Sequence, residues 1–170
     1  MKVNQAINTG PFVYCNLYQA PHQKLTYQNS GDGHYHQWLY IVEGEATGEV
    51  RETEDINTTP LYIGGPDEVG TLVDLHASKD KWVTTVTEEK GLAIVLFNPI
   101  PATSELDIEI VQGPATRTVT ATDKRITAVC ISGPITANGN TLISQQYAKI
   151  LPGNTVELIL PEYTTVALVK

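Results

Sequence analysis

The chain contains little cysteine and no closely spaced cysteine pair. Its 170 residues include 2 cysteines, Cys15 and Cys130, and no C-x-x-C motif. A disulfide framework in a chain of this size needs more cysteines, and a cysteine-type zinc site needs paired ones. Both cysteines stand in apolar, strand-like contexts, FVYCNLY and AVCISG. We therefore expect two buried, reduced thiols.

The chain also lacks long apolar runs and is poor in basic residues. No apolar stretch approaches the roughly 20 residues that span a bilayer, and the opening MKVNQAINTGPFVYC lacks a signal-peptide core. We expect no membrane association and no secretion through a signal peptide, with the cytoplasm as the default location and a virus particle as the alternative. With 11 Lys and Arg against 19 Asp and Glu, the formal net charge is −8, which argues against a nucleic-acid partner.

Helical periodicity is missing as well. No segment combines apolar residues at i, i+3, i+4 and i+7 with helix caps, whereas Thr and Val are frequent and 10 Pro and 13 Gly interrupt the chain. This composition predicts an all-β fold. The G-x-S-x-G, Walker and G-x-G-x-x-G motifs are also absent, so the common hydrolase and nucleotide-binding signatures are excluded.

Short apolar segments between turn residues predict the strands. After two edge-like strands within 11–30, broken at Pro21, the expected strands are 39–42, 46–53, 71–75, 82–87, 92–97, 126–132, 134–137, 146–151, 155–160 and 164–169. Gly91 and Asn138-Gly139 are predicted to form hairpin tips with the glycines at positive φ, the first hairpin joining 82–87 to 92–97. The prolines within 98–101 predict a linker. The expected domains are therefore 1–100 and a smaller second roll, 101–170.

The two halves share a short pattern. VEGEATG at 42–48 aligns with ISGPITANG at 131–139, and GTLVDL at 70–75 aligns with GNTVELI at 153–159. This pattern predicts two related β-rolls in which Gly44 matches Gly133 and Val73 matches Val156. All four histidines fall in the first half, so the second roll has none.

The segment 31–48, GDGHYHQWLYIVEGEATG, places two histidines before an apolar run and a glycine turn. Residues i and i+2 of a strand face the same side, so His34 and His36 can bind one metal ion. This stretch resembles the first motif of the cupin superfamily. The resemblance implies two cupin-like antiparallel β-rolls of jelly-roll type in one chain, similar to a bicupin. It also implies a metal site made by the H-x-H pair, a following Glu and a last histidine.

The chain departs from that motif at the later ligands. Gln37 stands where the family has its Glu, and a neutral amide is a poor ligand. For the last ligand, counting eleven residues from Gly70 gives Lys81, and counting from Gly65 gives His76. A protonated lysine cannot bind a metal, whereas a histidine can, and both registers stay open. The candidate metal ligands are therefore His34, His36 and His76.

We expect a non-catalytic cupin-fold binding or assembly module with an eroded metal site, such as an accessory protein of a virus particle. The alternative is a metal-dependent dioxygenase or isomerase that uses the three histidines. The expected cofactor is none or a weakly held divalent metal. The expected partners are further copies of the chain or a larger protein assembly, and a small molecule or sugar. The residues expected to line the ligand are Gln37, Trp38, Tyr40, Lys81 and Trp82.

Overall fold

The computed structural model describes residues 2–28, 37–75 and 80–170, which form β-strands joined by turns and loops, with no α-helix. The expected all-β fold is confirmed. The chain divides into two compact units, Met1–Glu105 (unit 1) and Leu106–Lys170 (unit 2). The candidate ligands His34, His36 and His76 lie outside the described residues. Within the described residues, no helix has the length and apolar character needed to cross a membrane.

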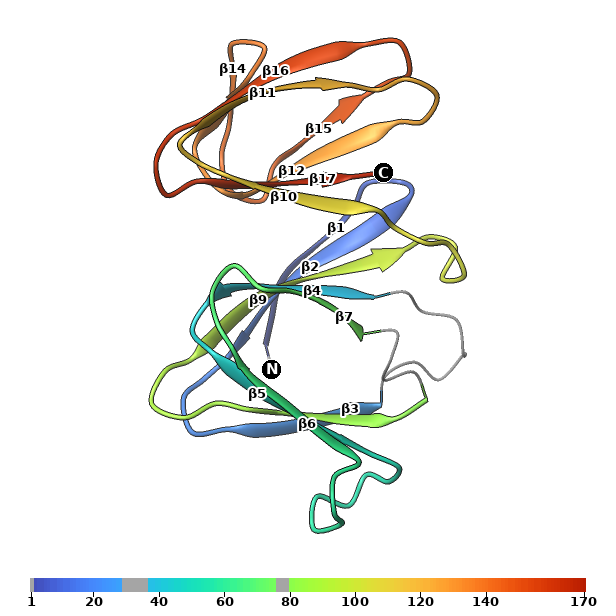
Figure 1. The fold of residues 1–170 in the computed structure, drawn as a ribbon, viewed down its shortest axis with the longest axis vertical. Helices are drawn as coiled ribbons and strands as arrows, with labels where there is room; N and C mark the ends of the chain where they lie inside the picture. The colour runs from blue at the N-terminus through green and yellow to red at the C-terminus, as the bar shows by residue number, and fades with distance from the viewer. Residues whose placement is uncertain (1, 29–36, 76–79) are drawn as a thin grey trace. The chain divides into compact units, whose positions relative to one another are not determined.

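Unit 1 consists of two antiparallel sheets (Figure 1). Its strands are β1 (Lys2–Asn8), β2 (Phe12–Gln19), β3 (Lys24–Gln28), β4 (Trp38–Glu43), β5 (Ala46–Arg51), β6 (Tyr62–Asp67), β7 (Leu72–Asp74), β8 (Trp82–Val86) and β9 (Leu92–Pro99). Sheet A has the order β1-β2-β9-β4-β7, and sheet B has the order β3-β8-β5-β6. Strand β9 continues to Pro99, which pairs with Phe12, so the linker predicted from Asn98 begins only at Ile100.

Unit 2 also consists of two antiparallel sheets (Figure 1). Its strands are β10 (Ile108–Gln112), β11 (Ala115–Thr120), β12 (Ile126–Ser132), β13 (Ile135–Ala137), β14 (Asn140–Leu142), β15 (Tyr147–Ile150), β16 (Thr155–Leu160) and β17 (Thr165–Val169). Sheet C has the order β10-β17-β12-β15, and sheet D has the order β11-β16-β13-β14.

The two units share one strand order. Leaving β1 aside, β2 to β9 correspond in sequence to β10 to β17, and both sets place the first, eighth, third and sixth strands in one sheet. The second, seventh, fourth and fifth strands form the other sheet. This arrangement is the double-sheet jelly roll, to which cupins belong. Each unit is therefore a cupin-like antiparallel β-roll.

The common order tests the predicted repeat. Gly44 and Gly133 each directly follow the third strand of their roll, so they occupy equivalent places. The pairing of Val73 with Val156 is wrong, because Val73 lies on the sixth strand of unit 1 and Val156 lies on the seventh strand of unit 2. An apolar-acid-apolar pattern fits any half-buried strand, so this short match could not distinguish neighbouring strands.

One of the two predicted hairpins is also wrong. Strand β8 belongs to sheet B and β9 belongs to sheet A, so the connection between them crosses from one sheet to the other. The backbone of Gly91 does not adopt a positive φ. A Cβ there would lie 2.4 Å from Tyr18 Oη, so close approach explains this glycine. The other hairpin is confirmed, with Asn138 at φ 47° and Gly139 at φ 76° between β13 and β14.

Each roll has an apolar core of its own. The core of unit 1 contains Leu17, Leu39, Ile41, Leu75, Leu92 and Ile94. The core of unit 2 contains Val119, Ala121, Ile126, Ala128, Cys130, Ile135, Ala137, Ile150, Leu158, Leu160, Val166 and Leu168. As expected, both thiols are free, although Cys15 is only partly buried. Burial raises the pKa of Cys15, and it raises the pKa of Cys130 to about 11, so neither thiol is an activated nucleophile.

Candidate functional site

The aromatic residues expected to line a ligand project away from the interior of unit 1. On β4, Leu39 and Ile41 belong to the core of the roll. Because successive side chains of a strand alternate between faces, Trp38 and Tyr40 lie on the outer face of sheet A. Trp82 alternates in the same way with Val83, which lines the interior cavity described below. The structure therefore does not gather these three rings around one ligand.

Gln37 and Lys81, the residues at which the chain departs from the cupin ligand pattern, are paired with other side chains. Gln37 Nε2 donates a hydrogen bond to Asn98 Oδ1 on β9. Lys81 Nζ contacts Glu52 Oε1 at 2.7 Å. Gln37 and Lys81 fit a metal poorly, because a neutral amide and a cation offer no anionic ligand. Within 2–28, 37–75 and 80–170, no three His, Cys, Asp or Glu side chains gather as a potential metal site.

The described ends of the two histidine-bearing segments meet in unit 1. The backbone N–H of Leu75 donates to the carbonyl oxygen of Gln37 at 2.9 Å. In the sequence, Gln37 directly follows the H-x-H motif, and Leu75 directly precedes His76. This hydrogen bond therefore joins the residue that follows the H-x-H motif to the residue that precedes His76.

A cavity of about 360 Å³ lies between strand β7 of sheet A and strands β5, β6 and β8 of sheet B. Its lining consists of Gly48, Val50, Tyr62, Gly64, Gly65, Asp67, Val73, Asp74, Leu75 and Val83. Four of these residues are aliphatic and three are glycines, so the wall is mostly apolar. None of them is a site residue predicted from the sequence, although six fall in predicted strands: Gly48, Val50, Val73, Asp74, Leu75 and Val83.

Gly48 provides part of the free space in this cavity. A Cβ added at Gly48 would meet no atom within 4 Å, and its backbone is outside the positive-φ region. A larger residue therefore fits there without backbone strain and would project into open space. Tyr27 pairs with Val83 across the β3–β8 ladder, so its ring shares the interior face. Burial raises the pKa of Tyr27 to about 12.

A buried polar bridge joins the two sheets of unit 1. Gln19 is 0% exposed, and its amide nitrogen donates to the carbonyl oxygens of Thr85 at 3.0 Å and Gln23 at 3.1 Å. The Thr85 hydroxyl donates to Gln19 Oε1 at 2.7 Å. Both amide protons and the amide oxygen are thus paired, which satisfies the requirement for a buried polar group.

These features define a class of protein, the cupin-like double jelly roll. No protein-family model matches the chain, and no curated protein matches it in sequence. Several solved structures are similar to it in fold, among them the following three. The conserved protein PA5104 from Pseudomonas aeruginosa PAO1 has a TM-score of 0.60 and 12% identity, with 94% of this chain and 80% of that chain covered.

The other two are similarly distant. AerE from Microcystis aeruginosa has a TM-score of 0.58 and 7% identity, with 96% of this chain and 88% of that chain covered. YhaK from Escherichia coli has a TM-score of 0.56 and 12% identity, with 95% of this chain and 86% of that chain covered. At such identities the likeness shows the fold and not the activity.

Proposed function

We propose that the chain is a non-catalytic cupin-fold binding module that holds a small, mostly apolar molecule in the cavity of unit 1. The carrying observation is the cavity of about 360 Å³ between aliphatic side chains of both sheets. That volume lies within the usual range of small-molecule sites, which combine apolar walls with a few polar groups. Asp67, Asp74 and Tyr62 supply those polar groups and favour a ligand that also carries hydroxyl or amine donors.

The residues at the metal-ligand positions support a binding role over a catalytic one. The amide of Gln37 is directed to Asn98, and the ammonium group of Lys81 is paired with Glu52. This pattern suits an eroded metal site. The shared strand order of the two units supports a degenerate bicupin as the origin of the chain.

The test fills the cavity and measures a neutral apolar probe. N-phenyl-1-naphthylamine fluoresces when it enters an apolar site, and we expect the parent protein to bind it. Gly48→Val adds a side chain where a Cβ has no neighbour within 4 Å, so affinity should fall at least tenfold while folding is retained. The matched control is Thr47→Val, because the adjacent residue faces the other side of β5. A parent that binds no probe, or a Gly48→Val variant with parental affinity, would refute the proposal.

The alternative function is a metal-dependent dioxygenase or isomerase using His34, His36 and His76. The observation that favours it is the hydrogen bond between Leu75 and Gln37, because Gln37 follows His36 in the sequence and Leu75 precedes His76. Metal analysis of the purified protein decides between the two functions. About one iron, zinc or manganese per chain, lost in the double variant His34→Ala with His36→Ala, would replace the binding role with the enzymatic one.

Self-association through a sheet surface forms part of the same proposal. Leu61, Tyr62 and Ile63 are 58%, 65% and 59% exposed. Leu61 directly precedes β6, an edge strand of sheet B that begins with Tyr62 and Ile63. Exposed apolar edges favour strand pairing with another chain. Light scattering should therefore give a mass above that of one chain, and Ile63→Lys should reduce it. A monomeric parent would remove this part of the proposal.

A further inference from the structure

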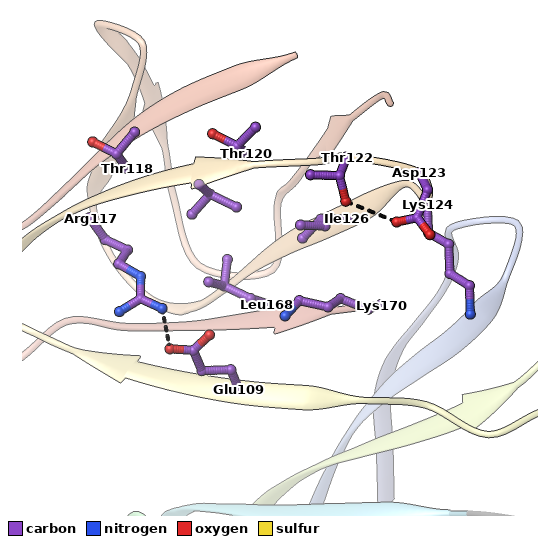
Figure 2. Close-up of a pocket in the computed structure, with 11 residues that line it drawn as sticks. Glu109, Arg117, Thr118, Thr120, Thr122, Asp123, Lys124, Ile126, Leu168 and Lys170 are labelled. Carbon is purple, nitrogen blue, oxygen red and sulfur yellow. Dashed lines mark hydrogen bonds and ion pairs between the residues drawn. The ribbon is translucent and has the colours of Figure 1, made fainter. Parts of the chain in front are cut away.

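Unit 2 has a pocket of its own, with a volume of about 250 Å³ (Figure 2). Strands β10 and β11, each at the edge of its sheet, contribute to its walls together with the turn between β11 and β12. Its floor is apolar, because Val119, Ile126 and Leu168 are 6%, 5% and 1% exposed. The pocket lies entirely within unit 2 and is separate from the cavity of unit 1.

The walls of this pocket carry more positive than negative side chains, in contrast to the chain as a whole. Three of the 11 basic residues line it, Arg117, Lys124 and Lys170, against two carboxylates, Glu109 and Asp123. The formal charge of the chain is −8, so this local excess of cations runs against the overall balance. Such a concave cationic surface attracts anions.

Several donors of these cations are still available. Arg117 Nη2 contacts Glu109 Oε1 at 2.6 Å, and no other partner of the guanidinium occurs among the described residues. A guanidinium has five N–H donors, so most remain for a ligand. Lys170 Nζ lies 3.9 Å from Asp107 Oδ2, which is too long for a direct hydrogen bond. Lys124 has no carboxylate within 4.0 Å in the part of the chain that the structure describes.

Asp123 lies beside Lys124 in this pocket, and a local hydrogen bond favours its charged form. The Thr122 hydroxyl donates to Asp123 Oδ1 at 2.9 Å, and this hydrogen bond lowers the pKa of Asp123. Figure 2 shows this pair near Lys124, while Arg117 and Glu109 meet farther along the pocket. The two carboxylates keep the net charge of the pocket small, which disfavours highly charged anions.

One wall of the pocket is the turn between β11 and β12, which has a counterpart in the connectivity of unit 1. The 121–125 turn joins the second and third strands of unit 2, as the segment with the H-x-H motif joins the second and third strands of unit 1. Two backbone hydrogen bonds tie this turn to the β15–β16 connection: Gly153 N to Ala121 O at 2.7 Å and Ala121 N to Asn154 O at 3.0 Å. In the sequence, this connection of unit 2 carries Lys124 and Arg125, whereas the corresponding connection of unit 1 carries His34 and His36.

We propose that unit 2 binds a small monocarboxylate with a short apolar body in this pocket. The carboxylate accepts hydrogen bonds from Arg117 on the side of Lys170, and the apolar body covers the floor of Val119, Ile126 and Leu168. A volume of about 250 Å³ lies below the usual range for drug-sized ligands, so the acid is short. Planar, bidentate recognition of carboxylate is the particular strength of arginine.

The test compares probes that separate the charge from the body. In calorimetric titration, benzoate should bind the parent protein at least tenfold more tightly than benzyl alcohol, which has the ring but no charge. Inorganic phosphate, which has the charge but no apolar body, should also bind at least tenfold more weakly than benzoate. Equal binding of either comparison probe, or no binding of benzoate, would overturn the proposal.

Variants then locate the binding. Arg117 is 48% exposed, so Arg117→Gln should leave the fold intact and weaken benzoate at least tenfold, with partial recovery in Arg117→Lys. Lys149→Gln is the matched control, because Lys149 lies on β15 of unit 2 outside the pocket. An equal effect of both charge removals would mean general attraction and refute the site. Gly48→Val should leave benzoate binding unchanged, so this test is independent of the site in unit 1.

Discussion

The buried bridge at Gln19 gives the sharpest test of the unit 1 architecture, through Gln19→Glu. The glutamine donates two hydrogen bonds, to the carbonyl oxygens of Thr85 and Gln23, and accepts one from the Thr85 hydroxyl. A protonated glutamic acid supplies one donor in place of two. It therefore loses one of the two donated hydrogen bonds and sets an oxygen against a carbonyl oxygen at a buried site, at a cost of about 1–3 kcal/mol.

The ionised form should cost far more. It places a negative charge against two carbonyl oxygens at a site that is 0% exposed, and such burial costs several kcal/mol. Burial and the two carbonyls both raise the folded-state pKa of Glu at position 19 above the unfolded value of about 4.3. The folded state then binds more protons than the unfolded state. Stability is greatest below about pH 4.3 and falls by about 1.4 kcal/mol per pH unit until the folded pKa is passed.

Urea unfolding at pH 5 and pH 8 measures this effect. The chain has 2 tryptophans, Trp38 and Trp82, both in unit 1, so tryptophan fluorescence reports the unfolding of that unit alone. Relative to the parent, Gln19→Glu should lose at least about 2 kcal/mol more at pH 8 than at pH 5. Gln23→Glu makes the same change on an exposed side chain and should stay within about 0.5 kcal/mol at both pH values. Equal behaviour of the two variants at pH 8 would refute the buried bridge.

Two further predictions use the same fluorescence readout. Gly44→Ala should lower the free energy of unfolding by at least about 2 kcal/mol, because Gly44 has φ 88° and its Cβ would lie 2.0 Å from Gly91 O. The control Gly48→Ala adds a Cβ that meets nothing within 4 Å, so it should change stability by no more than about 1 kcal/mol. Equal losses in the two variants would contradict this account. Burial raises the pKa of Tyr27 from 10.0 to about 12, so the folded state keeps its proton to higher pH and stability should fall as pH rises from about 10 to 12. Tyr27→Phe should remove about 1–2 kcal/mol of that loss, and an unchanged pH profile would show that the phenol is not buried.

The strands were predictable where a short apolar run ended at a turn residue. Asn138-Gly139 is the clearest example, because a two-residue turn with both residues at positive φ belongs to a hairpin. The segments around Gly91 show the limit of this reasoning. Two apolar strands with a glycine between them fit a hairpin and a crossing between sheets equally well. Only the long-range pairing of β8 with β3 and β5 decides between the two.

The direction of the β4 side chains was not predictable from the sequence. Leu39, Tyr40 and Ile41 are 7%, 2% and 1% exposed, so both faces of this strand are buried. Hydrophobic alternation identifies the inner face only when the other face meets water. The sequence therefore gave no reason to prefer Leu39 over Tyr40 as an interior residue. The cavity was equally hidden, because it depends on glycines whose missing side chains leave space between distant strands.

The glycine contacts near the start of β9 constrain how this chain can change in evolution. At Gly91 the nearest obstacle to a side chain is Tyr18 Oη, the far end of a flexible residue, so a second substitution at Tyr18 can accommodate a first one at Gly91. At Gly44 the obstacle is the backbone oxygen of Gly91, which no substitution removes. One glycine is therefore replaceable in two steps, and the other is fixed for as long as the roll keeps this path.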